Sequence, residues 1–157
     1  MRGLTMGVIG LTTPVTPLGG IYRIFGLHLP DFCDVGQDLV DELRGQGIVP
    51  VVVLSHLGLE DDRRLAETVA GIDLIVGAHS HDRLPAGEER NGVLIAQAGE
   101  YAQALGRVDL TLDPVSGRVL DRSAQVLDVP EDEPPDPAVR HSLEGHSDGT
   151  AGGGGCR

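Results

Sequence analysis

Residues 49–81 read VPVVVLSHLGLEDDRRLAETVAGIDLIVGAHSH, and this stretch decides the fold. Residues 49–55 are almost continuously apolar and β-branched, which is typical of a strand covered on both faces, as in a parallel sheet. Residues 60–70 place apolar side chains at helical spacing and begin with acidic residues, which the helix dipole favours. Residues 72–76 form a second short apolar run. A strand, a helix and a strand within roughly 30 residues predict a βαβ unit.

The flanking segments extend this pattern on both sides. Upstream, residues 5–12 are expected to form a strand and residues 34–45 a helix with Asp34 as its N-cap. Downstream, the sequence predicts strands over residues 93–98, 105–112 and 118–129. The last two alternate apolar and polar residues across a turn at residues 113–117, which predicts an antiparallel hairpin. Residues 88–90 are interpreted as a solvated loop. The predicted fold class is therefore α/β, with a βαβ unit followed by an antiparallel hairpin.

Composition limits the classes of partner. The 157 residues carry a net charge of −12, and all twelve basic residues are arginine. An acidic chain without a basic stripe is expected to bind neither nucleic acid nor a membrane surface. Aromatic residues make up only 3%, which argues against stacking platforms for bases. The two cysteines, Cys33 and Cys156, form neither a disulfide framework nor a cysteine-rich zinc module.

The chain divides into one ordered domain and a tail. We expect the domain to span residues 3–129, and residues 130–157 to form a disordered tail that is acidic and then glycine-rich. The first ten residues alternate as a strand does and have no clear cleavage site, so no signal peptide is predicted and the localisation stays unknown.

Three histidines follow the two strands of the βαβ unit. His56 comes directly after the first strand, and His79 and His81 follow the second in the sequence GAHSH. Because parallel strands place their carboxyl ends at one edge, where α/β sheets bind ligands, the three imidazoles are predicted to meet there. His79 and His81 would face one side if that segment is extended. Such a cluster suits a divalent transition metal such as Zn, Mn or Fe, with Asp82 as a candidate carboxylate that orients a histidine.

Three sequence blocks together resemble the calcineurin-like metallophosphoesterases, and within them the 5′-nucleotidase branch. They are VLSHLG at residues 53–58, IDLIVGAHSH at residues 72–81, and IAQAGEY at residues 95–101 followed by LGR at residues 105–107. The resemblance implies a partial metallo-dependent phosphatase-type β-sandwich with flanking helices over residues 3–129. It also implies a site for two divalent ions, in which His56 and His79 bind one ion and His81 the other. The implied activity is hydrolysis of a nucleotide or related phosphate ester by a metal-bound hydroxide.

The resemblance covers only the second half of that catalytic domain. The Asp-x-His, Gly-Asp and Asn-His motifs of the first half are not found in the chain, so no residue matches the family's acid/base histidine. Three histidines without a bridging carboxylate cannot hold two cations close together. We therefore expect a truncated or frameshifted chain, with little activity alone and the missing N-terminal half as its structural partner. The family is often periplasmic or secreted.

Two other interpretations are consistent with the same residues. The chain could be a non-catalytic metal-binding or interaction remnant, or a mononuclear zinc hydrolase with three histidine ligands. Metal stoichiometry separates them, because about one tightly bound zinc ion per chain fits the second and no bound metal fits a remnant.

Overall fold

The computed structural model describes residues 4–13, 24–26, 29–130 and 132–147. Most of the segment between residues 13 and 30 lies outside the described residues. Among those described, no helix is both long enough and apolar enough to cross a membrane.

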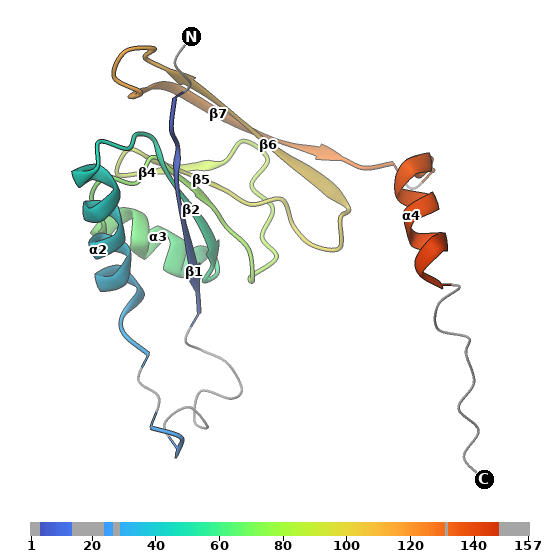
Figure 1. Cartoon of the computed structure of the whole chain (residues 1–157), viewed down its shortest axis with the longest axis horizontal. Coiled ribbons are helices and arrows are strands. Elements are labelled where there is room, and N and C mark those ends of the chain that lie inside the picture. The colour runs from blue at the N-terminus through green and yellow to red at the C-terminus, as the bar shows by residue number, and fades with distance from the viewer. Residues whose placement is uncertain (1–3, 14–23, 27–28, 131, 148–157) are drawn as a thin grey trace.

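A five-stranded sheet in the order β1-β2-β3-β5-β4 forms the centre of the fold (Figure 1). The first four strands in this order are mutually parallel, and β4 is antiparallel to β5. The strands are β1 (Gly7–Thr12), β2 (Val51–His56), β3 (Leu74–Val76), β4 (Glu88–Arg90) and β5 (Val93–Ala96). Strands β2 and β3 with the helix between them form the predicted βαβ unit. The interpretation of residues 88–90 as a loop is wrong, because the Asn91-Gly92 turn folds them back onto β5.

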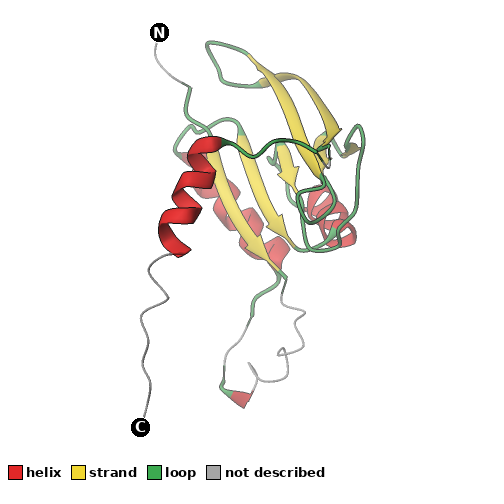
Figure 2. Cartoon of the chain, turned by 90° about the vertical axis from the view of Figure 1, so that its right-hand side faces the viewer, coloured by secondary structure: helices red, strands yellow, loops and turns green. Residues whose placement is uncertain are grey.

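Two helices cover one side of this sheet (Figures 1 and 2). They are α2 (Phe32–Gly45) and α3 (Leu59–Thr68). Alternate residues of the strands point toward them, and the resulting core includes Val51, Val53, Ile75, Ile95 and Leu65, all fully buried. The N-cap of α2 is Asp31, whose carboxylate accepts the Cys33 N–H at 2.8 Å, and not Asp34 as the sequence predicts. Asp34 lies instead in the first turn, where the helix dipole also favours an acid.

The opposite side of the sheet is covered by the hairpin of β6 (Ala104–Leu112) and β7 (Val119–Asp128). A smaller cluster joins Val52, Leu74 and Leu94 of the sheet to Val108, Leu110 and Ala124 of the hairpin. The α/β class with a βαβ unit and an antiparallel hairpin is thus confirmed.

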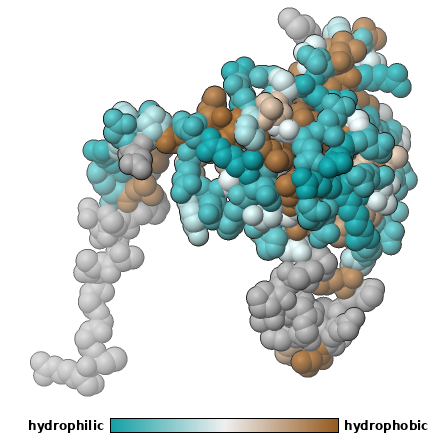
Figure 3. All heavy atoms as spheres, turned by 180° about the vertical axis from the view of Figure 1, so that it is seen from behind, coloured by the Kyte–Doolittle hydropathy of each residue, from teal (hydrophilic) through white to brown (hydrophobic). Residues whose placement is uncertain are grey.

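The hairpin covers only part of that side. Val8, Leu54 and Val76 point away from the helices and stay 56%, 51% and 39% exposed. They lie on β1 and at the ends of β2 and β3, and Met6 just before β1 adds to the same apolar surface. The exposed set is here named the open face: Met6, Val8, Leu54 and Val76. Figure 3 views the molecule from behind, where hydrophilic residues cover most of the described body and hydrophobic residues show in smaller patches.

Helix α4 (Pro137–Ser147) lies in the segment for which the sequence predicts a disordered tail. Asp136 accounts for the difference, because its carboxylate accepts the N–H groups of Ala138 and Val139 and so caps the first turn. The described side chains of α4 are exposed, and Figure 1 shows the helix standing apart from the sheet. The division of the chain at residue 130 stays a prediction.

Candidate functional site

The carboxyl ends of β2 and β3 carry the three predicted histidines. His56 is the last residue of β2, and the loop after β3 holds His79 and His81; all three are exposed. The strands are parallel neighbours in register, with Val52 beside Leu74 and Leu54 beside Val76. This pairing brings the turn after β2 against the loop after β3.

The rings of His56 and His79 lie side by side. Their centroids are 5.0 Å apart and their planes are inclined by 59°. Gly58 follows in the turn after β2, and its φ of 98° lies in a region that L side chains rarely adopt. An added Cβ there would stand 3.6 Å from His79 Cδ2 and from the Cβ of Ser80. The backbone of the turn between β2 and α3 therefore packs directly on the loop after β3.

His81 has different neighbours. Its Nδ1 lies 2.6 Å from a carboxylate oxygen of Glu100, and its ring centroid is 6.3 Å from that of Tyr101. The expected extended geometry of this loop is wrong, because His79 and His81 have left-handed φ values of 78° and 60°. Non-glycine residues in this region cost about 1 kcal/mol each, and such strain concentrates at functional sites.

The structure gives the histidines one carboxylate that sequence reasoning did not assign to them. Glu100 follows β5 and contacts His81, whereas Asp82 contributes its backbone carbonyl, which accepts the Gly99 N–H at 2.9 Å. The IAQAGEY block contained the signal, since it follows the next parallel strand of the sheet. The role of Asp82 in orienting a histidine stays a prediction.

An open cavity of about 520 Å³ lies between the two loops and the start of α3. Its lining combines histidine with several charged side chains: Glu60, Asp61, Arg63, His79 and Asp82, with Ser80 and residues 57–59 completing it. Three carboxylates against one guanidinium make this lining acidic.

The single arginine of the cavity is already paired. Glu88 holds the Arg63 guanidinium through both oxygens, with Nε–Oε1 and Nη2–Oε2 distances of 2.9 and 2.7 Å, and Glu60 contacts it as well. The Arg63 hydrogen bonds lower the pKa of Glu88 to about 2, so this pair stays charged at neutral pH. Arg63 is therefore held in a fixed ion pair and is not free to bind an anion in the cavity.

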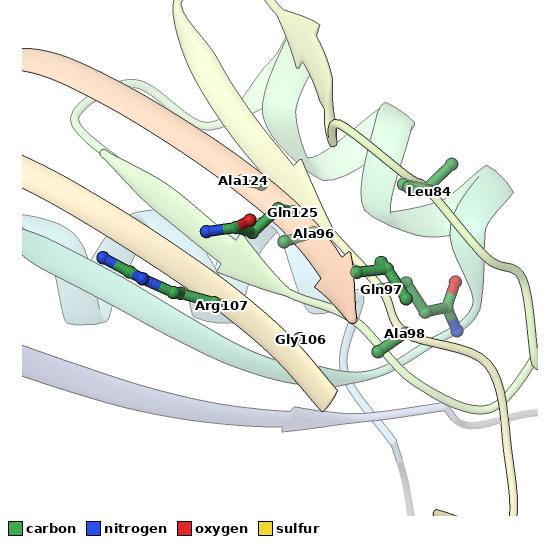
Figure 4. Close-up of a pocket in the computed structure, with 9 residues that line it drawn as sticks. Leu84, Ala96, Gln97, Ala98, Gly106, Arg107, Ala124 and Gln125 are labelled. Atoms are coloured by element: carbon green, nitrogen blue, oxygen red, sulfur yellow. The ribbon is translucent and has the colours of Figure 1, made fainter. Parts of the chain in front are cut away.

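A second cavity, of only about 50 Å³, lies where the hairpin meets β5 (Figure 4). Small residues surround it, including Ala96, Ala98, Gly106 and Ala124. Figure 4 shows Arg107 and Gln125 extending away from Gln97, so their polar groups do not converge. This space marks the contact between sheet and hairpin.

Among the described residues, no group of three or more His, Cys, Asp or Glu side chains is arranged to hold a single metal ion. The paired imidazoles of His56 and His79 nevertheless fit a metal, because neutral imidazole is a common ligand and four ligands are usual for zinc. If a metal binds here, His56 and His79 would supply two of those ligands.

The sequence of the chain is similar to sequences of known metallophosphoesterases. No protein-family model matches the chain. The uncharacterized metallophosphoesterase YunD of Bacillus subtilis is 34% identical over 130 residues, covering 83% of this chain and 27% of YunD. The trifunctional nucleotide phosphoesterase protein YfkN of the same organism is 32% identical over 150 residues, covering 90% of this chain and 10% of YfkN. Over most of its length the chain is therefore related to metallophosphoesterases.

Solved structures narrow the relationship. The 5′-nucleotidase precursor from Thermus thermophilus superposes with a TM-score of 0.72 at 28% identity, covering 94% of this chain and 32% of that protein. The calcineurin-like phosphoesterase YfkN superposes with a TM-score of 0.79 at 19% identity, which supports the fold alone. The resemblance to the 5′-nucleotidase branch of the calcineurin-like metallophosphoesterases is thus confirmed. The chain spans a tenth to about a quarter of the length of the first curated relatives.

Proposed function

We propose that this chain forms part of the catalytic domain of a metal-dependent phosphoester hydrolase that acts on nucleotides or related phosphate esters. One observation carries the proposal: two imidazoles meet at the carboxyl ends of adjacent parallel strands, beside an open acidic cavity. The relatives named as nucleotide phosphoesterases and 5′-nucleotidases support the choice of substrate class.

The proposed ligands are His56 and His79 for one divalent ion and His81 for a second. Glu100 would orient His81 by accepting a hydrogen bond from its Nδ1, which leaves the other ring nitrogen free to bind a metal. When bound, such ions acidify a water molecule and offset the charge of the phosphoryl group.

The charges around the cavity favour binding of divalent ions before binding of the phosphate ester. Its three carboxylates attract cations and repel a phosphate ester in their absence. Arg63 does little to offset that repulsion, because Glu88 and Glu60 already neutralise its guanidinium. We therefore expect phosphate esters to bind only after divalent ions have reversed the local charge.

The remaining ligands are proposed to come from a further segment of the same catalytic domain. The open face supports this proposal, since several exposed apolar side chains on one face of a sheet are typical of a surface that another element covers. The chain alone is accordingly expected to show little or no turnover.

Two assays test the proposal. The purified chain is first incubated with Mn²⁺ or Zn²⁺ and either p-nitrophenyl phosphate or a nucleoside monophosphate, and robust turnover would contradict its dependence on a further segment. A chimera then carries residues 4–128 in place of the matched segment of the Thermus thermophilus 5′-nucleotidase. We expect metal-dependent hydrolysis that falls at least 100-fold in His56→Ala, as removal of groups that stabilise the transition state commonly does. A folded chimera without activity would contradict the proposed function.

A further inference from the structure

A fully buried carboxylate lies against residues that precede both paired histidines in the chain. Asp62 is in the first turn of α3, and it is 0% exposed. Its Oδ1 accepts a hydrogen bond from the hydroxyl of Ser55, the residue before His56. Among the described residues, its Oδ2 is a buried side-chain oxygen without a hydrogen-bond partner.

The Ser55 hydroxyl links this carboxylate to the turn that carries His56. Besides donating to Asp62, its oxygen accepts the N–H of Leu57 at 3.2 Å. The backbone on both sides of His56 is thereby fixed through a single oxygen atom.

The second carboxylate oxygen of Asp62, Oδ2, lies against the start of the loop after β3. Gly77 lies two residues before His79, and any side chain at Gly77 would collide with Asp62 Oδ2. A second tie runs parallel to this contact: the Ser80 hydroxyl accepts the Leu59 N–H at 3.0 Å and lies 3.4 Å from the amide group of Gln97. The end of β2, the start of α3 and the loop after β3 are thus joined at two points.

Burying the Asp62 carboxylate at this position costs free energy, because the charged form loses its hydration. Burial raises its pKa to about 6, although the Ser55 hydrogen bond opposes the shift. An apolar side chain of similar size would avoid that cost of burying a charge. The carboxylate is therefore better explained by its contacts with both loops than by packing.

We propose that Asp62 is a positioning residue that acts through Ser55 and against Gly77 to hold the His56 and His79 rings side by side. The inference rests on the proposed function for its meaning, because it concerns the same pair of ligands. Its geometric content can be tested without metal or substrate.

The test is NMR spectroscopy of the full chain without metal. The ring protons of His56 and His79 are expected to give nuclear Overhauser cross-peaks, because the two rings lie close together. Asp62→Ala should remove these cross-peaks and speed exchange of the Leu57 amide at least tenfold, while methyl signals of the core remain. Asp62→Asn keeps an oxygen that can accept from Ser55, so both signatures should return. Glu67→Ala removes an exposed carboxylate from the same helix and serves as the matched control, with no expected change.

Ser55→Ala provides a second break in the link and should also remove the cross-peaks, which keeps the proposal testable if Asp62→Ala does not fold. Unchanged cross-peaks in a folded Asp62→Ala or Ser55→Ala chain would overturn the proposal, and so would their absence from the wild-type chain. Because no catalysis is measured, an inactive chimera would count against the proposed function and leave this result standing.

Discussion

The two faces of the five-stranded sheet differ in how completely they are covered. On the helix face, Val51, Val53, Ile75 and Ile95 are all fully buried. On the other face the hairpin covers Val52, Leu74 and Leu94 and leaves the open face exposed. The helices that cover the first face are supplied by the connections between parallel strands, so that layer is local in sequence. The second face needs a separate element, and this chain contributes one hairpin to it.

The histidine site shows the same difference between a supported side and an open side. The turn after β2 and the loop after β3 are fixed from the helix side through Asp62 and Ser80, whereas the acidic cavity remains open. The chain thus supplies a well-supported set of histidines at the margin of an incompletely covered sheet.

The largest expected difference in stability is between substitutions at two adjacent residues of β3 whose side chains face opposite sides of the sheet. Ile75→Ala should lower the free energy of unfolding by about 3–4 kcal/mol, because it empties a fully buried site. Val76→Ala on the open face should cost less than about 1 kcal/mol. Urea unfolding of the two variants measures the difference, and equal losses would contradict the assignment of faces.

Asp62 gives the helix face a pH dependence. Its pKa is about 6 in the folded chain and 3.8 in the unfolded reference, so the unfolded state releases its proton first as the pH rises. The free energy of unfolding should therefore fall between about pH 4 and pH 6, by up to about 3 kcal/mol from this group. Asp62→Asn should flatten that part of the profile. A profile that the substitution leaves unchanged would show that Asp62 titrates normally.

Gly87 allows a test of the close packing around β5 and the hairpin residue Ala124. Gly87 has a φ of 71°, and an added Cβ would stand 2.7 Å from Leu94 Cδ1 and 3.1 Å from both the Ala124 Cβ and the Ile95 carbonyl oxygen. Gly92 has a similar φ of 76° and open space around it. Gly92→Ala should cost about 1 kcal/mol from backbone strain alone, and Gly87→Ala about 1–3 kcal/mol more from overpacking. Thermal unfolding compares them, and equal costs would show that Leu94, Ile95 and Ala124 do not crowd this position.

The smallest expected effect on stability belongs to the open face. Val8→Thr and Leu54→Gln should change the free energy of unfolding by less than about 0.5 kcal/mol in the chain alone. They should nevertheless reduce concentration-dependent self-association in sedimentation experiments, because exposed apolar surface promotes it. A large loss of stability in either variant would mean that this face is already covered in the isolated chain.

Sequence patterns predicted the parts of the fold that depend on local signals. The continuous apolar runs and the helical spacing between them placed β2, α3 and β3, and the alternation in β6 and β7 predicted a hairpin. Strand β4 was missed because Glu88 and Arg90 carry no strand signal. They pair with β5 through its backbone and with Arg63 through the Glu88 side chain.

The candidate site was predictable in part for the same reason. His56 and His79 follow apolar strands, so sheet topology alone predicts that they meet. The His81–Glu100 contact and the buried Asp62 depend on loop geometry and on long-range packing. No glycine signals the positive φ values at His79 and His81, and Asp62 looks like one of three ordinary first-turn acids.

The most direct test of the central claim is the divalent metal content of the chimera with the Thermus thermophilus 5′-nucleotidase, measured after dialysis. We expect about two ions per chain, and a clear loss of bound metal when His56, His79 and His81 are all replaced by alanine. Equal metal content in the chimera and its folded triple variant would contradict the claim that these histidines are metal ligands.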